Sequence, residues 1–191
     1  MSNDILCCSG LTKTQAGQPI FHNINFTLRQ GEILACIGKE SPALIKVLIG
    51  KDVNYTGEFQ INGSLGCVLQ SDTVSSVQTP LQILQEANIR HETNDMLVGM
   101  LSIAELDSKR NTLCNKLTSG EIRRLLLIRE ILTTPSLLIL EDIFSDVLVE
   151  DQKIIEGMLI EANAYIAVFL TASSTENICK LVDKVVYLDT K

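Results

Sequence analysis

A glycine and a lysine directly follow the apolar run Ile33–Ile37, where a strand gives way to a helix. A loop that holds phosphate needs glycines whose backbone N–H groups reach the oxygens, a lysine for the terminal phosphates and a Ser or Thr for Mg²⁺. Gly38, Lys39 and Ser41 are therefore candidates for phosphate binding, whereas Glu40 would repel an anion. An ordinary strand–turn–helix connection explains the same residues and is the favoured interpretation, and its helix N-terminus would attract an anion only weakly.

Two carboxylates, Glu141 and Asp142, follow a second apolar run, Leu137–Leu140. Two carboxylates together at the end of a buried strand are candidates for chemistry. The alternative is a solvated acidic turn without chemistry.

A third candidate is the segment Thr118-Ser119-Gly120-Glu121 at the start of an expected helix, Glu121–Leu132. A hydroxyl and a glycine at a helix N-terminus can meet an anion. The structural alternative makes Thr118 or Ser119 the N-cap, with Glu121 supporting the first turn. The pair Arg123-Arg124 is expected on one face of this helix.

The length, net charge and apolar fraction of the chain limit the classes of protein to which it can belong. The chain has 191 residues, a formal net charge of −7 and an apolar fraction of 46%. It is long enough for one domain with a sizeable core, and it lacks the clustered basic face of nucleic-acid-binding proteins. No secretory signal is visible in residues 1–10, and no run approaches the roughly 20 apolar residues of a spanning helix. We therefore expect no nucleic-acid partner and no direct membrane insertion.

The six cysteines form no C-x-x-C pair and have no histidine at zinc spacing, so no metal site is expected. Most lie in apolar stretches and indicate small buried side chains in a reducing compartment. They are Cys7, Cys8, Cys36, Cys67, Cys114 and Cys179.

The elements that must position these residues alternate between strands and helices, which predicts an α/β fold with a mostly parallel sheet covered on both faces. Short strands around Ile5–Cys8 and Ile20–Leu28 come first. A helix is expected over Ala43–Ile49, with Ser41 as N-cap and Pro42 at the first helical position. The later expected elements are helices over Gln152–Ala162 and Thr175–Leu181, and strands over Ile166–Leu170 and Val185–Leu188.

Residues 71–116 differ from the rest because apolar residues recur there at helical spacing, around Leu81–Ile89 and again over Met96–Leu106. We interpret this stretch as a helical subdomain of two or three helices inserted into a single domain, residues 1–191.

Several short motifs follow one another along nearly the whole chain, in an order and at spacings typical of one known protein family. They are Leu11–Lys13, Ile24–Glu32, Thr56–Glu58, Ile61–Gly63, Gln70, Leu117–Glu121, Arg123–Leu132, Pro135 and Leu137–Asp142. Taken together they resemble the ATP-binding (nucleotide-binding) domain of ABC transporters. The resemblance implies a P-loop-NTPase-like sheet with antiparallel N-terminal strands, and it places Gln70 at the family's Q-loop.

The phosphate loop departs from the pattern that this resemblance implies. The family has G-x-x-G-x-G-K-[ST], whereas only Gly38 remains here, the loop is shortened and Lys39 stands at its wrong end. At the next motif the family has an Asp, which holds Mg²⁺ through water, and then a Glu, which polarises the attacking water. Here Glu141 and then Asp142 stand in these places. Each carboxylate then differs in reach by a methylene, and misplacement on that scale can cost ~10²-fold in rate.

Other positions that the family uses at its ATP site are also changed. Ala172 stands in the place of the switch histidine, Leu148 in the place of the D-loop aspartate and Gln15 in the place of the aromatic residue that stacks on adenine. The resemblance therefore implies a catalytically degenerate member in which ATP and Mg²⁺ bind weakly or not at all and hydrolysis by the chain itself is not expected.

The signature segment, Thr118–Glu121, keeps more of the family's pattern. In the family it acts on nucleotide held by the other subunit, and Thr118 and Gly120 keep the hydroxyl and one glycine. We therefore expect a non-hydrolysing partner of an active ABC subunit, docked with a transmembrane subunit on the cytoplasmic face of a membrane. The alternatives are a scaffold or regulatory module that acts by protein–protein contacts, and an active enzyme with a non-standard phosphate loop.

Overall fold

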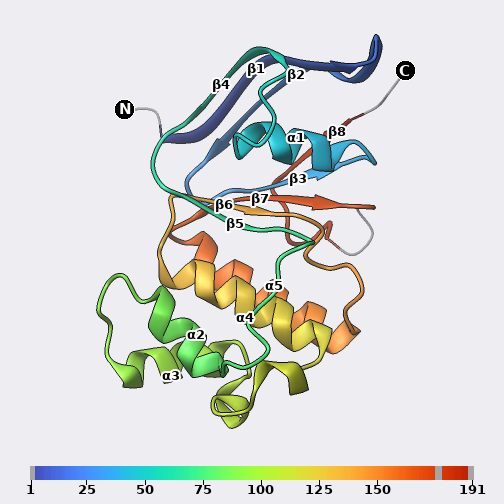
Figure 1. Cartoon of the computed structure of the whole chain (residues 1–191). Helices are drawn as coiled ribbons and strands as arrows, with labels where there is room; N and C mark the ends of the chain where they lie inside the picture. The colour runs from blue at the N-terminus through green and yellow to red at the C-terminus, as the bar shows by residue number, and fades with distance from the viewer. Residues whose placement is uncertain (1–2, 175–177, 189–191) are drawn as a thin grey trace.

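The computed structural model describes residues 3–174 and 178–188. Two sheets lie in separate layers with a helix between them (Figure 1). One sheet has three strands in the order β2-β1-β4, and the other has five strands in the order β5-β6-β7-β3-β8. The predicted α/β class, with a parallel sheet and antiparallel N-terminal strands, is confirmed.

The antiparallel sheet consists of β1 (Asp4–Gln15), β2 (Gln18–Arg29) and β4 (Thr56–Ile61). The first two strands are longer than the apolar runs predict, because pairing between them continues to Gln15 and Gln18 at the turn. Backbone hydrogen bonds within a hairpin extend both strands beyond the residues that bury side chains.

The parallel sheet consists of β5 (Leu65–Val68), β6 (Leu137–Leu140), β7 (Ala167–Ala172), β3 (Ile33–Ile37) and β8 (Lys184–Tyr187). The bounds of β3 and β6 are those of the two apolar runs in the sequence. Their registers place Val68 beside Leu140 and Ile37 beside Ala172, so these strands end at the same edge of the sheet. Loops that follow them are therefore brought together.

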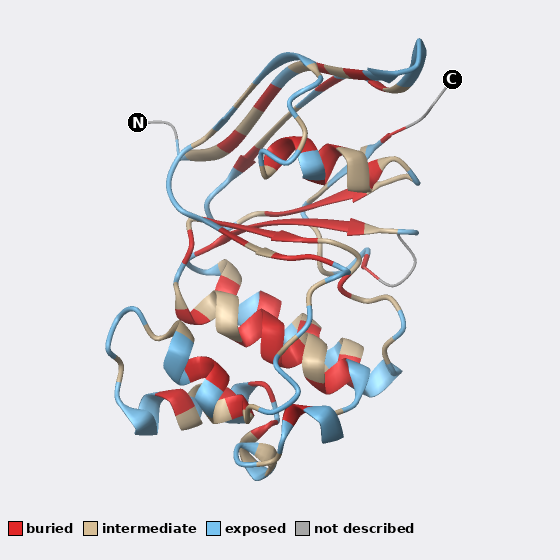
Figure 2. Ribbon diagram, in the orientation of Figure 1, coloured by how far each residue is buried: buried red, intermediate tan, exposed pale blue. Residues whose placement is uncertain are grey.

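Side chains of the parallel strands alternate between two apolar cores. Leu34 and Cys36 pack in the core shared with helix α1 (Ser41–Leu48) and the antiparallel sheet, whereas Ile33 and Ala35 face the opposite side. This alternation explains why β3 is wholly apolar in sequence, since both of its faces are covered. Figure 2 shows the resulting band of buried residues through the middle of the molecule.

Helices α4 (Ser119–Leu132) and α5 (Val149–Asn163) cover the second face of the parallel sheet. Helices α2 (Pro80–Ala87) and α3 (Asn94–Ile103) lie beyond α4, followed by single 3₁₀ turns at Asp107–Lys109 and Cys114–Lys116. The helix expected to reach Leu106 ends at Ile103, because the chain passes through a positive φ of 52° at Glu105.

The helix expected over Thr175–Leu181 is not found in its described part, because Ile178–Leu181 form turns, and residues 175–177 lie outside the described residues. None of the helices in residues 3–174 and 178–188 is long and apolar enough to span a bilayer. Cys8, Cys36 and Cys114 are buried, and burial raises the pKa of both the Cys8 and Cys36 thiols to about 12.

Candidate functional site

The candidate residues at the ends of β3, β5, β6 and β7 meet around one cavity of about 240 Å³. It brings together the phosphate-loop, Q-loop and acidic-pair positions and the residues around Ala172. Its lining is formed by Gly38, Lys39, Ser41, Pro42, Gln70, Glu141, Asp142, Thr171, Ala172 and Ser173.

The connection between β3 and α1 is very short. Only Lys39 and Glu40 separate Gly38 from the helix, which begins at Ser41. Gly38 has a φ of +140°, and a Cβ there would lie 2.8 Å from the carbonyl oxygen of Leu188. This glycine is therefore required by its close approach to the end of β8.

The expected N-cap at Ser41 is wrong, because the cap is Glu40 and Ser41 is the first helical residue. The loop is so short that the Glu40 carbonyl already accepts the helical amides of Ala43, at 3.0 Å, and Leu44, at 3.4 Å. The Ser41 amide donates to the Gly38 carbonyl at 3.0 Å, and Pro42 has no amide. Most of the backbone amides at the start of this helix therefore donate hydrogen bonds to carbonyl groups of the same chain.

The two carboxylates after β6 differ in their surroundings. Glu141 Oε2 accepts a hydrogen bond from the backbone amide of Gln70 at 3.1 Å. Asp142 has a φ of 49°, and its amide donates to the Thr171 hydroxyl at 3.0 Å. Glu141 thus contacts the Q-loop backbone, and Asp142 is held by a side chain from β7.

Arg123 is a residue of this region that the sequence analysis did not assign to it. Its guanidinium donates to the carbonyl oxygens of Leu69 at 3.1 Å and Gln70 at 3.2 Å. Arg124 points elsewhere, so the expectation that both arginines share one face is wrong. Consecutive residues of an α-helix point about 100° apart, which already separates the two side chains.

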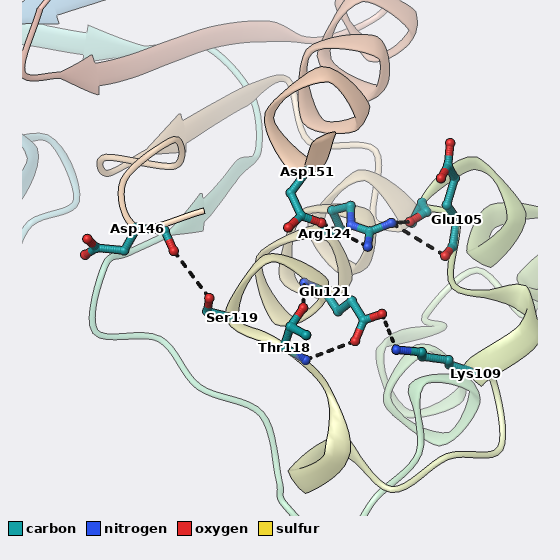
Figure 3. A network of polar contacts seen from close by, with 9 residues as sticks. Glu105, Lys109, Thr118, Ser119, Glu121, Arg124, Asp146 and Asp151 are labelled. Carbon is teal, nitrogen blue, oxygen red and sulfur yellow. Dashed lines mark hydrogen bonds and ion pairs between the residues drawn. The ribbon is translucent and has the colours of Figure 1, made fainter. Parts of the chain in front are cut away.

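The signature segment lies at the start of α4 (Figure 3), and none of its residues lines the cavity. Thr118 is the N-cap: its hydroxyl accepts from the Glu121 amide at 3.2 Å, and Glu121 Oε2 accepts from the Thr118 amide at 2.9 Å. This reciprocal pair is the capping box that the structural alternative predicts. Thr118 and Ser119 are exposed, whereas Gly120 and Glu121 are buried.

Glu121 also forms an ion pair with Lys109. Burial alone would raise the pKa of this carboxyl, but the hydrogen bonds from Lys109 and Thr118 and the nearby charges outweigh it and hold the pKa below its usual value. The carboxylate form is therefore the one that the fold stabilises.

Gly120 lies against Asp151, the third residue of α5. A Cβ at Gly120 would lie 2.0 Å from Asp151 Oδ2, which leaves no room for a side chain. Asp151 Oδ1 in turn contacts Arg124 Nη2 at 3.0 Å, and both side chains are buried (Figure 3). The glycine of the signature segment is thus in contact with a carboxylate of its own chain.

The remaining changed positions lie at the surface. Leu148 is 68% exposed and is the N-cap of α5, where it forms no side-chain cap. Gln15 is exposed at the end of β1. In the described part of the chain no group of His, Cys, Asp and Glu side chains is arranged to hold a metal ion.

The sequence of this chain is similar to those of known ATP-binding proteins of transport systems. No family model matches the chain. It is similar to the tungstate uptake system ATP-binding protein of Peptoclostridium acidaminophilum, with 23% identity over 201 residues that cover 95% of this chain and 92% of the relative. It is 26% identical over 190 residues to an aliphatic sulfonates import ATP-binding protein of Nocardia farcinica, covering 95% of this chain and 76% of the relative.

Solved structures share the same fold. A metal-chelate type ABC transporter in an inward-facing conformation matches with a TM-score of 0.85 and 21% identity, covering 98% of this chain and 80% of that one. The ADP conformation of an ATP-binding cassette of an ABC transporter matches with a TM-score of 0.83 and 14% identity, covering 97% and 87%. The shared fold and a sequence similarity that runs along nearly the whole chain together give good support for placing this protein in the family of ABC transporter ATP-binding domains.

Proposed function

We propose that this chain is an ABC transporter subunit with a degenerate ATP site, which acts as the non-hydrolysing member of a pair. Its partner would be an ABC subunit with a competent site, and both would dock on a transmembrane subunit at the cytoplasmic face of a membrane. The observation that carries the proposal is the short connection from Gly38 to Ser41, in which the Ser41 amide donates to the Gly38 carbonyl and the next residue, Pro42, has no amide hydrogen.

Nucleotide fits this site poorly. A phosphate group is held by several free amides that point into a loop, but here Ser41 and Ala43 donate to Gly38 and Glu40, and Pro42 has none to offer. The cavity of about 240 Å³ also lies below the roughly 300–1,000 Å³ of most small-molecule sites. Because Mg-ATP does not fit the residues present, no hydrolytic step is assigned to them.

The acidic pair supports the same proposal. The Glu141 carboxylate, in the place where the resemblance puts a Mg²⁺-binding acid, accepts the Gln70 amide instead. Ala172 lines the cavity where a histidine is expected and offers no polar atom on its side chain. The acid that would bind Mg²⁺ and the histidine that would contact the terminal phosphate are thus both without their family counterpart here.

The signature segment supports the paired arrangement. Thr118 and Ser119 are exposed at the N-terminus of α4, where the Thr118 hydroxyl accepts the Glu121 amide and can still donate its own hydrogen to an anion. In a pair they would face the nucleotide of the competent partner. A homodimer of this chain would contain no competent site, so we propose a heterodimer.

The relatives support the transporter setting. Their names describe ATP-binding proteins of tungstate uptake and aliphatic sulfonate import systems. In the proposed assembly, residues 71–116 form a helical subdomain that contacts the transmembrane subunit together with the loop at Gln70. A scaffold or regulatory module is the second candidate, favoured by the adjacent exposed apolar side chains of Leu148 and Val149, which suit a protein–protein contact.

Affinity purification of the tagged chain from its native cells, in detergent, tests the proposal. Recovery of a second ABC subunit and a membrane protein in a fixed ratio is expected. ATP turnover by that complex should then fall with Thr118→Ala, stay near normal with Thr118→Ser, which keeps the hydroxyl and the cap, and be unaffected by Asp142→Asn. Recovery of only non-membrane partners would favour the scaffold, and loss of turnover with Asp142→Asn would contradict the non-hydrolysing role.

A further inference from the structure

The consecutive arginines of α4 reach the two connections of the helical segment made by α2 and α3. Arg123 donates to the carbonyls of Leu69 and Gln70, where the chain leaves β5 toward α2. Arg124 donates to the carbonyl of Ala104 at 2.6 Å and to that of Glu105 at 3.5 Å, where the chain leaves α3. One helix therefore contacts this segment at its entry and at the end of its second helix.

Two further hydrogen bonds hold the backbone at Leu69 and Gln70, the entry connection to α2. The Gln70 amide donates to Glu141 Oε2, and the Leu69 amide donates to Asp72 Oδ2 at 2.8 Å. Both backbone polar groups of Gln70 are thus bonded, its carbonyl to Arg123 on α4 and its amide to Glu141 directly after β6. Hydrogen bonds that involve a charged partner are the stronger kind, so this short stretch of backbone is well fixed.

The exit connection is held by a buried charge. The Arg124 guanidinium lies between the Asp151 carboxylate and the carbonyls at the C-terminal end of α3, where the helix dipole favours a cation. The carbonyl oxygens of Ala104 and Glu105 and the Asp151 carboxylate all bond to its terminal nitrogens (Figure 3). The two terminal nitrogens of one planar guanidinium thus serve acceptors after α3 and on α5 at once.

We infer that Arg123 and Arg124 form a two-point lock that fixes the α2–α3 segment to α4, and that the lock needs no ligand. All of its contacts are made between residues of the chain itself. The position of the α2–α3 segment is then set by contacts with α4, with α5 and with Glu141, which follows β6. The lock stands on these contacts alone, so it does not depend on whether the chain binds nucleotide.

Residue-resolved amide hydrogen exchange on the full chain without nucleotide tests the two points separately. Arg123→Gln should raise exchange of the Leu69 and Gln70 amides by roughly 10- to 100-fold, the range that loss of charge-assisted hydrogen bonds gives. The Glu105 and Leu106 amides, which donate to Ser102 and Leu101, should stay protected in this variant.

Arg124→Lys is the matched variant at the other point. It keeps a cation beside Asp151, so the fold is retained, but a single ammonium cannot reproduce the fork. Exchange should rise at Glu105 and Leu106 and stay unchanged at Leu69 and Gln70. The Leu34 and Ala35 amides in β3 report global opening. A rise that is uniform and includes β3, or no rise at either connection, would overturn the lock.

Discussion

The backbone amide of Gln70 lies 3.1 Å from Glu141 Oε2 and donates a hydrogen bond to it. An acid at the end of β6 is thus bonded to the loop that follows the neighbouring strand β5. The contribution of this contact can be measured as a change in the stability of the fold.

Glu141→Ala should lower the free energy of unfolding by about 1 kcal/mol, the net contribution of a typical hydrogen bond. Glu141→Gln keeps an acceptor oxygen for the Gln70 amide and should cost less than half of that. Urea unfolding followed by circular dichroism measures both variants. Equal stabilities for the wild type and the Ala variant would show that the contact contributes nothing.

Gly120→Ala should destabilise the fold by ~1–3 kcal/mol, because its Cβ would lie 2.0 Å from Asp151 Oδ2 and the buried pair would have to shift. The matched control is Gly157→Ala in the middle of α5, where a Cβ meets nothing within 4 Å. There the substitution should stabilise by roughly 0.5–1 kcal/mol through helix propensity. Thermal unfolding of the two variants side by side tests the contrast, and a loss at both positions would contradict it.

Asp151→Ala should cost ~3–5 kcal/mol, because it leaves the buried Arg124 guanidinium without its carboxylate. In the same background Gly120→Ala should cost much less than in the wild type, since the atom it collides with is gone. A double-mutant cycle measures this coupling. Strictly additive effects would mean that Gly120 is small for another reason.

Stability should depend on pH through Glu121, whose carboxyl pKa is lowered in the folded state. A lowered folded pKa means that the carboxylate stabilises the fold above its unfolded pKa and that this contribution is lost as pH falls through the folded pKa. The difference in unfolding free energy between wild type and Glu121→Gln should therefore be full near neutral pH and shrink as pH falls below ~4.5.

Lys109→Met provides the control for this pH dependence. It removes the ion pair but leaves the Thr118 amide as a donor to Glu121, so part of the pH dependence should remain. Chemical unfolding at a series of pH values measures all three proteins. A wild-type minus Glu121→Gln difference that does not change with pH would contradict the assignment of this group.

The parts of the fold that depend on local pattern could be predicted from the sequence. Ile33–Ile37 and Leu137–Leu140 became β3 and β6 at their predicted bounds, because an uninterrupted apolar run must be covered on both faces. The capping box of Thr118 and Glu121 was also foreseeable, since its partners are three residues apart.

Other features depend on how distant segments pack. Arg124 and Asp151 are far apart in the chain, and nothing near either residue indicates its partner. The N-cap at Glu40 rather than Ser41 follows from how closely β3 and α1 approach, which the residue types alone do not fix. The contact of Arg123 with Leu69 and Gln70 escaped prediction because backbone carbonyls carry no sequence signal.

We propose that the site at Gly38–Ser41 does not hold Mg-ATP, because the connection is short, its Ser41 amide donates to Gly38 and Pro42 has no amide hydrogen. Isothermal titration calorimetry of the purified chain with Mg-ATP tests it most directly. The account predicts no saturable heat at nucleotide concentrations up to about 1 mM, a binding free energy weaker than about −4 kcal/mol. Saturable binding with a micromolar Kd, lost on substitution of Lys39 by Ala, would contradict it.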